Sequence, residues 1–233
     1  MDAEDLDPVR HVQALRALAR VNRVSLVAAR VWREVLHLSR GSRDRSSRGR
    51  RDRKEHRPLR ILHVACGGGD VMVDVARRAQ QASLPLVVQG CDLSPVALEH
   101  ARREAGRRGV AAEFFARDVL ADGLPGGYDL VCSSLFHHHL SREDAVELLR
   151  GMAEAGRRVL VQDLLRGTLG YLLAWSGLRL LSRSEVAHVD GPRSVRAAFT
   201  LPEVRAMAAE AGYVGEVIRR GWPERFILRW RGP

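Results

Sequence analysis

Short apolar runs alternate with amphipathic segments through most of the chain. Five runs have the length and apolar content of buried strands: residues 60–65, 86–90, 112–116, 128–133 and 158–163. Segments with helical spacing separate several of them, at residues 70–81, 94–106 and 142–151. Strands that are joined through helices form a parallel sheet with right-handed crossovers. The pattern therefore predicts an α/β fold with a doubly wound, mostly parallel sheet.

The end of the chain has a different pattern. Thr200 is a favourable N-cap for a helix that extends to about residue 211. Two segments with strand-like alternation follow, residues 214–220 and 225–230, and they predict an antiparallel hairpin. Together with the five parallel strands, this hairpin predicts a seven-stranded sheet.

Two apolar helical segments lie outside this alternation. Residues 9–38 carry apolar side chains at helical spacing and predict one helix, or a helical hairpin bent near Asn22. Residues 167–182 form a second such segment, and its longest apolar stretch is too short to cross a bilayer. The next residues, 186–192, place His188 and Asp190 where they could orient a hydroxyl group or stabilise a turn.

A glycine-rich loop follows the first apolar run. Gly67, Gly68 and Gly69 are consecutive, and Asp92 ends the next apolar run. Glycines let the backbone approach a ligand closely, and the N-terminus of the following helix directs its N–H groups toward the same space. An acidic residue about twenty positions later can accept hydrogen bonds from a ribose. A dinucleotide site would have a third glycine where Met72 stands, so the loop favours a nucleoside cofactor without a pyrophosphate.

These residues resemble the first motif of class I S-adenosylmethionine-dependent methyltransferases, acidic-x-Gly-x-Gly-x-Gly. Gly67 and Gly69 occupy the second and third glycine positions of that motif. Ala65 stands for the first glycine, and His63 stands for the acidic residue that helps to position the amino group of the cofactor. The resemblance implies a Rossmann-like fold with S-adenosylmethionine as the cofactor.

The resemblance also assigns side chains to parts of the cofactor. Asp92 matches the carboxylate that binds the ribose hydroxyls, Leu93 would pack on the adenine, and Asp118 matches the residue that reads the adenine amino group. An Asp at a strand end can instead be a helix cap or a turn residue, and this alternative applies to both positions. The expected cofactor-binding residues are His63, Ala65, Cys66, Gly67, Gly69, Asp92, Leu93, Asp118, Val119 and Ser133.

Three consecutive histidines follow the fourth strand, where the transferable methyl group should lie. His138 and His139 match a His-His pair of the family, and His137 replaces an apolar residue. Adjacent histidines point in different directions, and no Cys or carboxylate has the spacing of a metal site, so no metal is expected. One imidazole could act as a general base toward a phenol, and His138 is the first choice. The alternative is that these histidines bond neighbouring backbone and fill the start of a loop.

Composition limits the remaining possibilities. The 233 residues, of which 45% are hydrophobic, suffice for one α/β core with N-terminal additions. The net charge of +10 raises the possibility of an RNA methyltransferase, since a basic arm supplies phosphate affinity. Residues 40–58 carry much of this charge, but they contain no aromatic residue that could stack on a base. They are interpreted as a basic flexible linker, and nucleic acid is not the expected partner.

The cysteines and the N-terminus both favour a cytoplasmic protein. Cys66, Cys91 and Cys132 are each expected at a strand end, and they form no C-x-x-C pair, as is typical of a reducing compartment. Residues 1–7 are acidic and have no apolar signal core. No membrane span is expected.

The regions outside the sheet are expected to define the substrate. Residues 1–39 are interpreted as an N-terminal helical lid, and residues 59–233 as the methyltransferase domain with a lid insertion at 167–199. Tyr171, Trp175 and His188 are the expected substrate contacts. An apolar lid favours a small apolar or aromatic acceptor, such as a phenolic, polyketide or quinone-like compound of secondary metabolism. O- and C-methylation both remain open, as do a homodimer and a partner subunit with weak cofactor binding.

Overall fold

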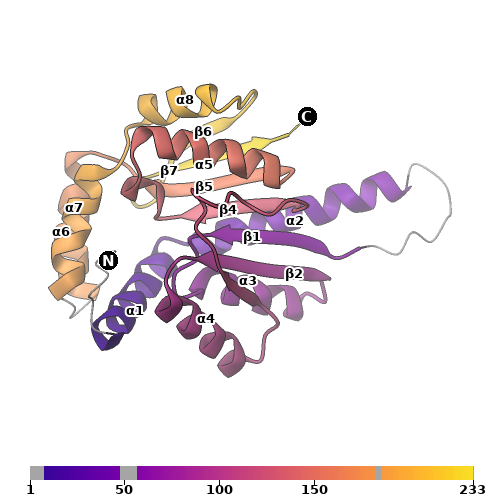
Figure 1. Ribbon diagram of the computed structural model, residues 1–233, viewed down its shortest axis with the longest axis horizontal. Helices are drawn as coiled ribbons and strands as arrows, with labels where there is room; N and C mark the ends of the chain where they lie inside the picture. The colour runs from indigo at the N-terminus through magenta and orange to yellow at the C-terminus, as the bar shows by residue number, and fades with distance from the viewer. Residues whose placement is uncertain (1–7, 48–56, 182–184, 233) are drawn as a thin grey trace.

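The computed structural model describes residues 8–47, 57–181 and 185–232. Helices cover both faces of one seven-stranded sheet (Figure 1). Its strands are β1 (Leu59–Val64), β2 (Leu86–Asp92), β3 (Glu113–Ala116), β4 (Leu130–Ser134), β5 (Arg158–Leu164), β6 (Val217–Gly221) and β7 (Arg225–Arg231). Their order is β3-β2-β1-β4-β5-β7-β6; the first five are mutually parallel, and β7 is antiparallel to both of its neighbours. The predicted α/β fold with an antiparallel C-terminal hairpin is confirmed.

The alternation of side chains along the central strands divides the core into two halves. Leu62 and Val131 pack toward α5 (Arg142–Ala155) and α8 (Leu201–Glu210). Ile61 and Leu160 face the other side, against α3 (Asp70–Gln81), α4 (Pro95–Arg108) and the N-terminal helices. Because both faces of the parallel strands are covered, these strands read in the sequence as continuous apolar runs.

The N-terminal segment forms two helices, α1 (Pro8–Val24) and α2 (Val27–Ser47). The sequence predicted one helix, or a helical hairpin bent near Asn22. The break falls at Leu26, whose φ of 56° lies in the left-handed region. Val27, Val31 and Val35 bury one side of α2 against the sheet. The helix continues through residues 40–47, which the sequence analysis assigned to the linker, and residues 48–56 of that linker lie outside the described residues.

Helices α6 (Thr168–Leu181) and α7 (Glu185–Ala197) lie side by side with α1 near them, at the edge where the parallel strands end (Figure 1). Residues 186–192 therefore belong to a helix, which rules out the turn-stabilising alternative for His188 and Asp190. Pro192 lies inside α7 and is buried, as is Val195. Packing of α7 along α6 stabilises a helix that the proline alone would disfavour.

Two smaller boundaries also differ from the prediction. β4 begins at Leu130, because Tyr128 makes only an isolated bridge to Gly156. His137–His139 forms a single turn of 3-10 helix, η1, rather than continuing as an extended loop. This turn directs the three histidine side chains to different surroundings. Within the described ranges, no helix is both long enough and apolar enough to cross a membrane.

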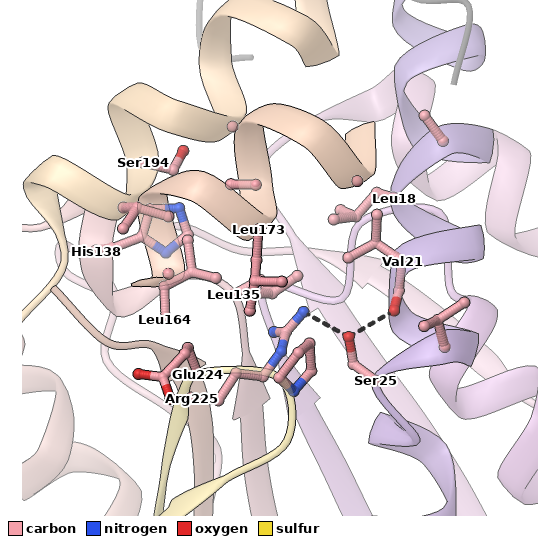
Figure 2. Close-up of a pocket in the computed structure, with 18 of the residues that line it drawn as sticks. Leu18, Val21, Ser25, Leu135, His138, Leu164, Leu173, Ser194, Glu224 and Arg225 are labelled. Atoms are coloured by element: carbon pink, nitrogen blue, oxygen red, sulfur yellow. Dashed lines mark hydrogen bonds between the residues drawn. The ribbon is translucent and has the colours of Figure 1, made fainter. Parts of the chain in front are cut away.

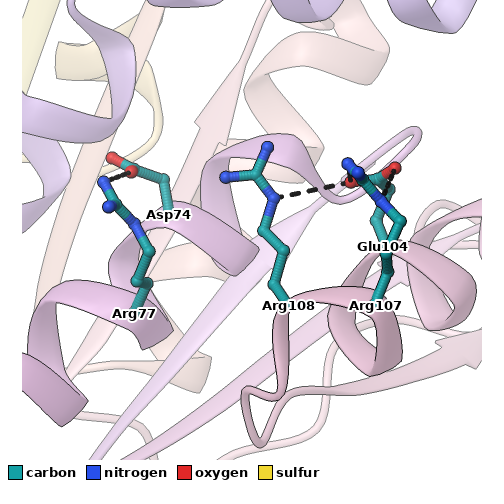
Figure 3. Close-up of polar contacts among 5 residues, drawn as sticks. All are labelled: Asp74, Arg77, Glu104, Arg107 and Arg108. Atoms are coloured by element: carbon teal, nitrogen blue, oxygen red, sulfur yellow. Dashed lines mark hydrogen bonds and ion pairs between the residues drawn. The ribbon is translucent and has the colours of Figure 1, made fainter.

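The outer surfaces of α3 and α4 carry local ion pairs (Figure 3). Asp74 Oδ1 lies 3.0 Å from Arg77 Nη2. Glu104 lies 2.8 Å from Arg107 and 3.5 Å from Arg108. Pairs at this spacing stabilise an exposed helix by roughly 0.2–0.5 kcal/mol each. They also neutralise part of the arginine charge within the helices themselves.

Candidate active site at the carboxyl ends of the strands

The glycine loop between β1 and α3 is a tight backbone turn. Gly67 and Gly69 have φ angles of 54° and 72°, in the left-handed region that favours glycine. A Cβ at Gly69 would lie 2.7 Å from the Cβ of Ala101 and 2.9 Å from the ring of Phe114. Gly69 is therefore required both for its conformation and for the close packing of the loop on α4 and β3.

Asp92 connects the end of β2 to this loop. Its Oδ2 accepts a hydrogen bond from the Gly67 amide at 2.7 Å, and its Oδ1 accepts one from the Ser94 amide at 2.9 Å. Leu93, the next residue, is 68% exposed. A carboxylate has about four lone-pair sites, so Asp92 retains capacity to accept hydrogen bonds from a ribose. The loop and Asp92 thus present the backbone cradle and the acceptor that a nucleoside needs.

Helix α1 packs against the glycine loop. Atoms of Leu15 lie 3.5–3.8 Å from where side chains on Gly67 and Gly68 would begin. Asn22 Nδ2 donates to Asp70 Oδ2 at 3.2 Å, at the start of α3. The N-terminal segment therefore contacts the loop directly, although its sequence lies outside every cofactor motif.

Other predicted cofactor residues have mainly structural contacts. Cys66 is 4% exposed and would touch a Cβ at Gly90, so its side chain packs in the core. His63 Nε2 lies 2.8 Å from Ser134 Oγ, and burial lowers the pKa of His63 to about 4. His63 is therefore neutral at physiological pH and does not reproduce the charge of the acidic residue that it replaces. Ser133 is 1% exposed, and Ala65 has a φ of 50°.

Asp118 has the hydrogen bonds of a turn residue, which is the alternative role that the sequence analysis left open. Its Oδ1 accepts hydrogen bonds from the amides of Leu120 and Ala121 at 3.0 and 3.1 Å, as in a turn. Val119, the neighbouring residue, packs against the core. For both residues, a contact with adenine stays a prediction.

A cavity of about 210 Å³ lies beyond the carboxyl ends of β4 and β5. Its walls come from α1, η1, the ends of β4 and β5, α6, α7 and the start of β7 (Figure 2). Apolar side chains such as Leu18, Leu135 and Leu173 form most of the surface. Parallel α/β sheets bind ligands outside the carboxyl ends of their strands, which is where this cavity opens.

His138 lines the cavity and is held by Asp163 at the end of β5. The His138 Nδ1 and Asp163 Oδ1 atoms are 2.7 Å apart, and the His138 amide donates to Asp163 Oδ2 at 3.1 Å. Burial would raise the pKa of Asp163, but His138 and the Leu164 amide outweigh it and lower that pKa to about 2. Because the carboxylate only accepts, the neutral imidazole carries its hydrogen on Nδ1, and in that tautomer Nε2 has the lone pair.

The three histidines have different surroundings. His137 is 2% exposed, its ring nitrogens have no partner among the described residues, and burial lowers its pKa to about 4. It does not line the cavity, so the structure does not support it as a base. His139 is exposed and lines the cavity, with its ring centroid 4.1 Å from that of His138. Among the described residues, no group of three or more His, Cys, Asp or Glu side chains is arranged to hold a metal.

The predicted substrate residues do not line the cavity. The face of α6 that does so carries Gly170, Leu173, Ala174 and Gly177. Tyr171 and Trp175 lie on another face, where Arg196 and Arg179 stack over their rings at 4.8 and 4.1 Å. His188 lies one turn before Gly191 on α7, outside the lining. The apolar content identified α6 correctly, but the sequence did not show which face this helix turns to the cavity.

The sequence analysis missed two polar residues of this site. Asp163 ends a parallel strand, a position that could have identified it, since the carboxyl ends of adjacent parallel strands meet at one edge. Arg225 begins β7, lines the cavity and is 1% exposed. An arginine in an alternating hairpin is normally on the surface, so the sequence carried no signal for its burial.

Comparisons with known proteins agree with this geometry. A family model described as a methyltransferase domain matches residues 61–158. A demethylmenaquinone methyltransferase of Thermus thermophilus is 34% identical over 172 residues, 68% of this chain and 76% of that enzyme. A ribosomal RNA small subunit methyltransferase C of Escherichia coli is 27% identical over 135 residues, and the match spans 58% of this chain and only 34% of that enzyme.

Solved structures share the fold. Magnesium protoporphyrin IX methyltransferase from Synechocystis PCC 6803, with bound S-adenosylhomocysteine, has a TM-score of 0.56 at 18% identity; the match covers 91% of this chain and 87% of that one. An O-methyltransferase family 2 protein from Planctomyces limnophilus, in complex with apigenin, has a TM-score of 0.60 at 17% identity and 99% and 63% coverage. The glycine loop and Asp92 suit the nucleoside part of S-adenosylmethionine, the cofactor of this enzyme. The chain belongs to the class I S-adenosylmethionine-dependent methyltransferases.

Proposed function

We propose that this methyltransferase acts on a small, largely apolar aromatic acceptor with a hydroxyl group, which binds in the cavity between α1, α6 and α7. The observation that carries the proposal is the His138–Asp163 pair, which places a hydrogen-bonded imidazole in a mostly apolar cavity. An apolar site with few polar groups selects an apolar ligand and orients it through those groups. In this proposal α1 and the 167–199 insertion act as the lid.

The size of the cavity is consistent with an aromatic acceptor. A dry cavity of about 150 Å³ in another protein is large enough for benzene. The cavity here, at about 210 Å³, has room for a somewhat larger ring system. Phenols, polyketide rings and quinols are the acceptor classes with this shape and an acidic hydroxyl group.

The chemistry assigned to the protein is proton removal, alignment and exclusion of water. The bound cofactor supplies a methyl group on a positively charged sulfur. Asp163 keeps the hydrogen of His138 on Nδ1, so His138 Nε2 accepts the hydroxyl proton of the acceptor while the bonding electrons stay on oxygen. When bound, the cofactor would supply the methyl group to that oxygen or to the ring carbon conjugated to it, and on carbon methylation the ring proton would pass to the oxygen. The glycine loop and Asp92 would hold the cofactor during this transfer.

Two relatives support different acceptors. The Thermus thermophilus relative is named a demethylmenaquinone methyltransferase, which favours a quinol-like acceptor here. The Escherichia coli relative acts on ribosomal RNA by its name, and the basic residues 40–57 keep RNA as the alternative. We favour the small molecule because the cavity wall is mostly apolar and helices α6 and α7 enclose it. Cytoplasmic location and a homodimer stay predictions from the sequence.

Transfer of a radiolabelled methyl group would test this proposal. The purified enzyme would be assayed with simple phenols, naphthoquinols and total RNA, and products would be identified by mass spectrometry. We expect label in a phenol or quinol, with His138→Ala lowering kcat ~10²–10⁴-fold and leaving S-adenosylhomocysteine affinity within a few-fold. Replacing the arginines of residues 40–53 with glutamine should leave this activity unchanged; Arg57 is retained because it pairs with the buried Asp129. Label in RNA alone would contradict the proposal.

A further inference from the structure

Arg225 is a buried guanidinium with incomplete hydrogen bonding. It is 1% exposed and lines the cavity. Its Nη2 donates to Ser25 Oγ at 2.9 Å, whereas its Nε and Nη1 have no partner among the described residues. In Figure 2 the guanidinium extends from the start of β7 toward Ser25, beside Leu135. An arginine has five N–H donors, so most of its hydrogen-bonding capacity is unused here.

The charges around Arg225 do not balance. Arg30, 8% exposed, lies on the same side, but it donates to the carbonyl oxygens of Ser25 and Trp222 and to Gln162 Oε1. The nearby buried carboxylate, Asp163, already accepts from His138 and from the Leu164 amide. Glu224 lines the cavity too, and its carboxylate lies 3.9 Å from Arg220 on the surface side of the hairpin. Asp163 is therefore the buried carboxylate whose charge acts on Arg225, and no hydrogen bond between the two is present among the described residues.

An unpaired buried cation is costly. Removing a charged group from water costs several kcal/mol unless a partner of opposite charge replaces the lost hydration. Burial lowers the pKa of Arg225 to about 10, which leaves the guanidinium charged at neutral pH. The cavity wall beside it offers mainly Val21, Leu135 and Leu164. Among the described residues, no carboxylate hydrogen-bonds to Nε or Nη1 of Arg225, so these nitrogens are suited to an anionic group of a ligand.

We propose that Arg225 binds an anionic oxygen of the acceptor, so that the cavity selects ligands that present a phenolate or an enolate oxygen. This inference rests on the proposed function, because it places the acceptor in this cavity. His138 removes the hydroxyl proton, the electron pair remains on oxygen, and the guanidinium pairs with that oxygen. The acceptor loses one proton and gains one methyl group, and the charge that Arg225 stabilises disappears as the new bond forms.

A purely structural role for Arg225 is the alternative. Its bond to Ser25 joins β7 to the junction of α1 and α2, and Ser25 Oγ in turn donates to the Val21 carbonyl at 2.7 Å. If this were its only role, Arg225 would affect folding and have no preference between charged and neutral ligands. The ionisation state of a bound ligand separates these two roles.

The test uses 4-nitrophenol, whose absorption spectrum distinguishes phenol from phenolate. The dye would be titrated with pH in the presence of excess full-length enzyme saturated with S-adenosylhomocysteine. We expect the wild-type enzyme to bind phenolate at least tenfold more tightly than phenol, which lowers the apparent pKa of the bound dye by about one unit or more. Arg225→Met should abolish this preference, and Arg225→Lys should retain part of it. Arg231→Met, at the exposed end of the same strand, is the matched control.

Each outcome decides the question. An unchanged dye pKa on the wild-type enzyme, or no binding of the dye, overturns the role of Arg225. The same preference in folded Arg225→Met, verified by thermal unfolding and S-adenosylhomocysteine binding, overturns it as well. If Arg225→Met does not fold, the wild-type pKa shift and the Arg225→Lys variant still decide. The dye measurement needs no turnover, so an enzyme that methylates a phenol without shifting the dye refutes this inference alone.

Discussion

The glycine loop and the cavity are built in contrasting ways. The loop uses Gly67, Gly69 and Asp92, which lie within 26 residues and are positioned by two adjacent parallel strands. The cavity collects side chains from Ala14 to Arg225, contributed by helices, strands and a hairpin. The loop is therefore a local structure, whereas the cavity exists only after the whole chain has folded.

The two regions also differ in how their polar groups are satisfied. In the loop, Asp92 already accepts two backbone hydrogen bonds before any ligand is considered. In the cavity, Arg225 keeps two buried nitrogens without a partner among the described residues. In the loop, the polar groups are mostly hydrogen-bonded within the protein, and little is left to distinguish one ligand from another. In the cavity, a few polar groups without partners stand in an apolar wall, and such groups select the ligand. Variants in the two regions should therefore affect different binding steps.

Among variants that distinguish the two regions, we expect the largest effect from Asp163, which we interpret as a residue that positions His138. Asp163→Asn should lower kcat by ~10²-fold or more, because an amide no longer fixes the hydrogen on His138 Nδ1. Since the pKa of Asp163 is lowered to about 2, the wild-type carboxylate stays ionised above about pH 4 and does not itself titrate in the assay range. Affinity for S-adenosylhomocysteine should change only a few-fold.

A double variant separates positioning from a general loss of structure. If Asp163 acts through His138, then Asp163→Asn combined with His138→Gln should be no slower than His138→Gln alone. Additive losses of kcat would show that the two residues act independently, and the positioning role would be rejected.

Asp92 should show the opposite pattern with a somewhat smaller effect. Asp92→Ala removes the acceptor for the Gly67 amide and for the ribose, so cofactor binding should weaken by ~1.5–3 kcal/mol, about 10- to 150-fold. Calorimetry with S-adenosylhomocysteine would measure this change. The pKa shift of bound 4-nitrophenol should persist in this variant at saturating cofactor. Unchanged cofactor affinity would mean that the ribose lies elsewhere.

The smallest effect tests which face of α6 meets the acceptor. Leu173 lines the cavity and is 37% exposed, whereas Leu172 is 54% exposed and does not line it. Leu173→Ala should raise KM for the acceptor about fivefold, since roughly 1 kcal/mol of apolar contact is lost. Leu172→Ala, the matched control, should leave KM unchanged. Equal effects of the two variants would indicate that the acceptor uses a different face of the helix.

Much of the fold was readable from the sequence, and the exceptions have clear causes. The strands and crossover helices were predicted within a few residues, because both faces of the parallel strands are buried and appear as apolar runs. The sequence did not predict the helix at residues 186–192, because packing on α6 outweighs the local effect of Pro192. The sequence analysis treated His137, His138 and His139 together as candidate bases, but the η1 turn buries His137 away from the cavity.

The sequence by itself determined the glycine loop and the position of Asp92, because glycine conformation and the position of an acidic residue after a strand are local properties of the chain. It also placed a histidine at the end of β4, where it meets the cavity. Only the tertiary structure decided that Asp163 holds this histidine, that Arg225 is buried in the wall of the same cavity and that α6 turns Leu173 inward. Those arrangements depend on contacts between residues more than 20 positions apart, which no local pattern encodes.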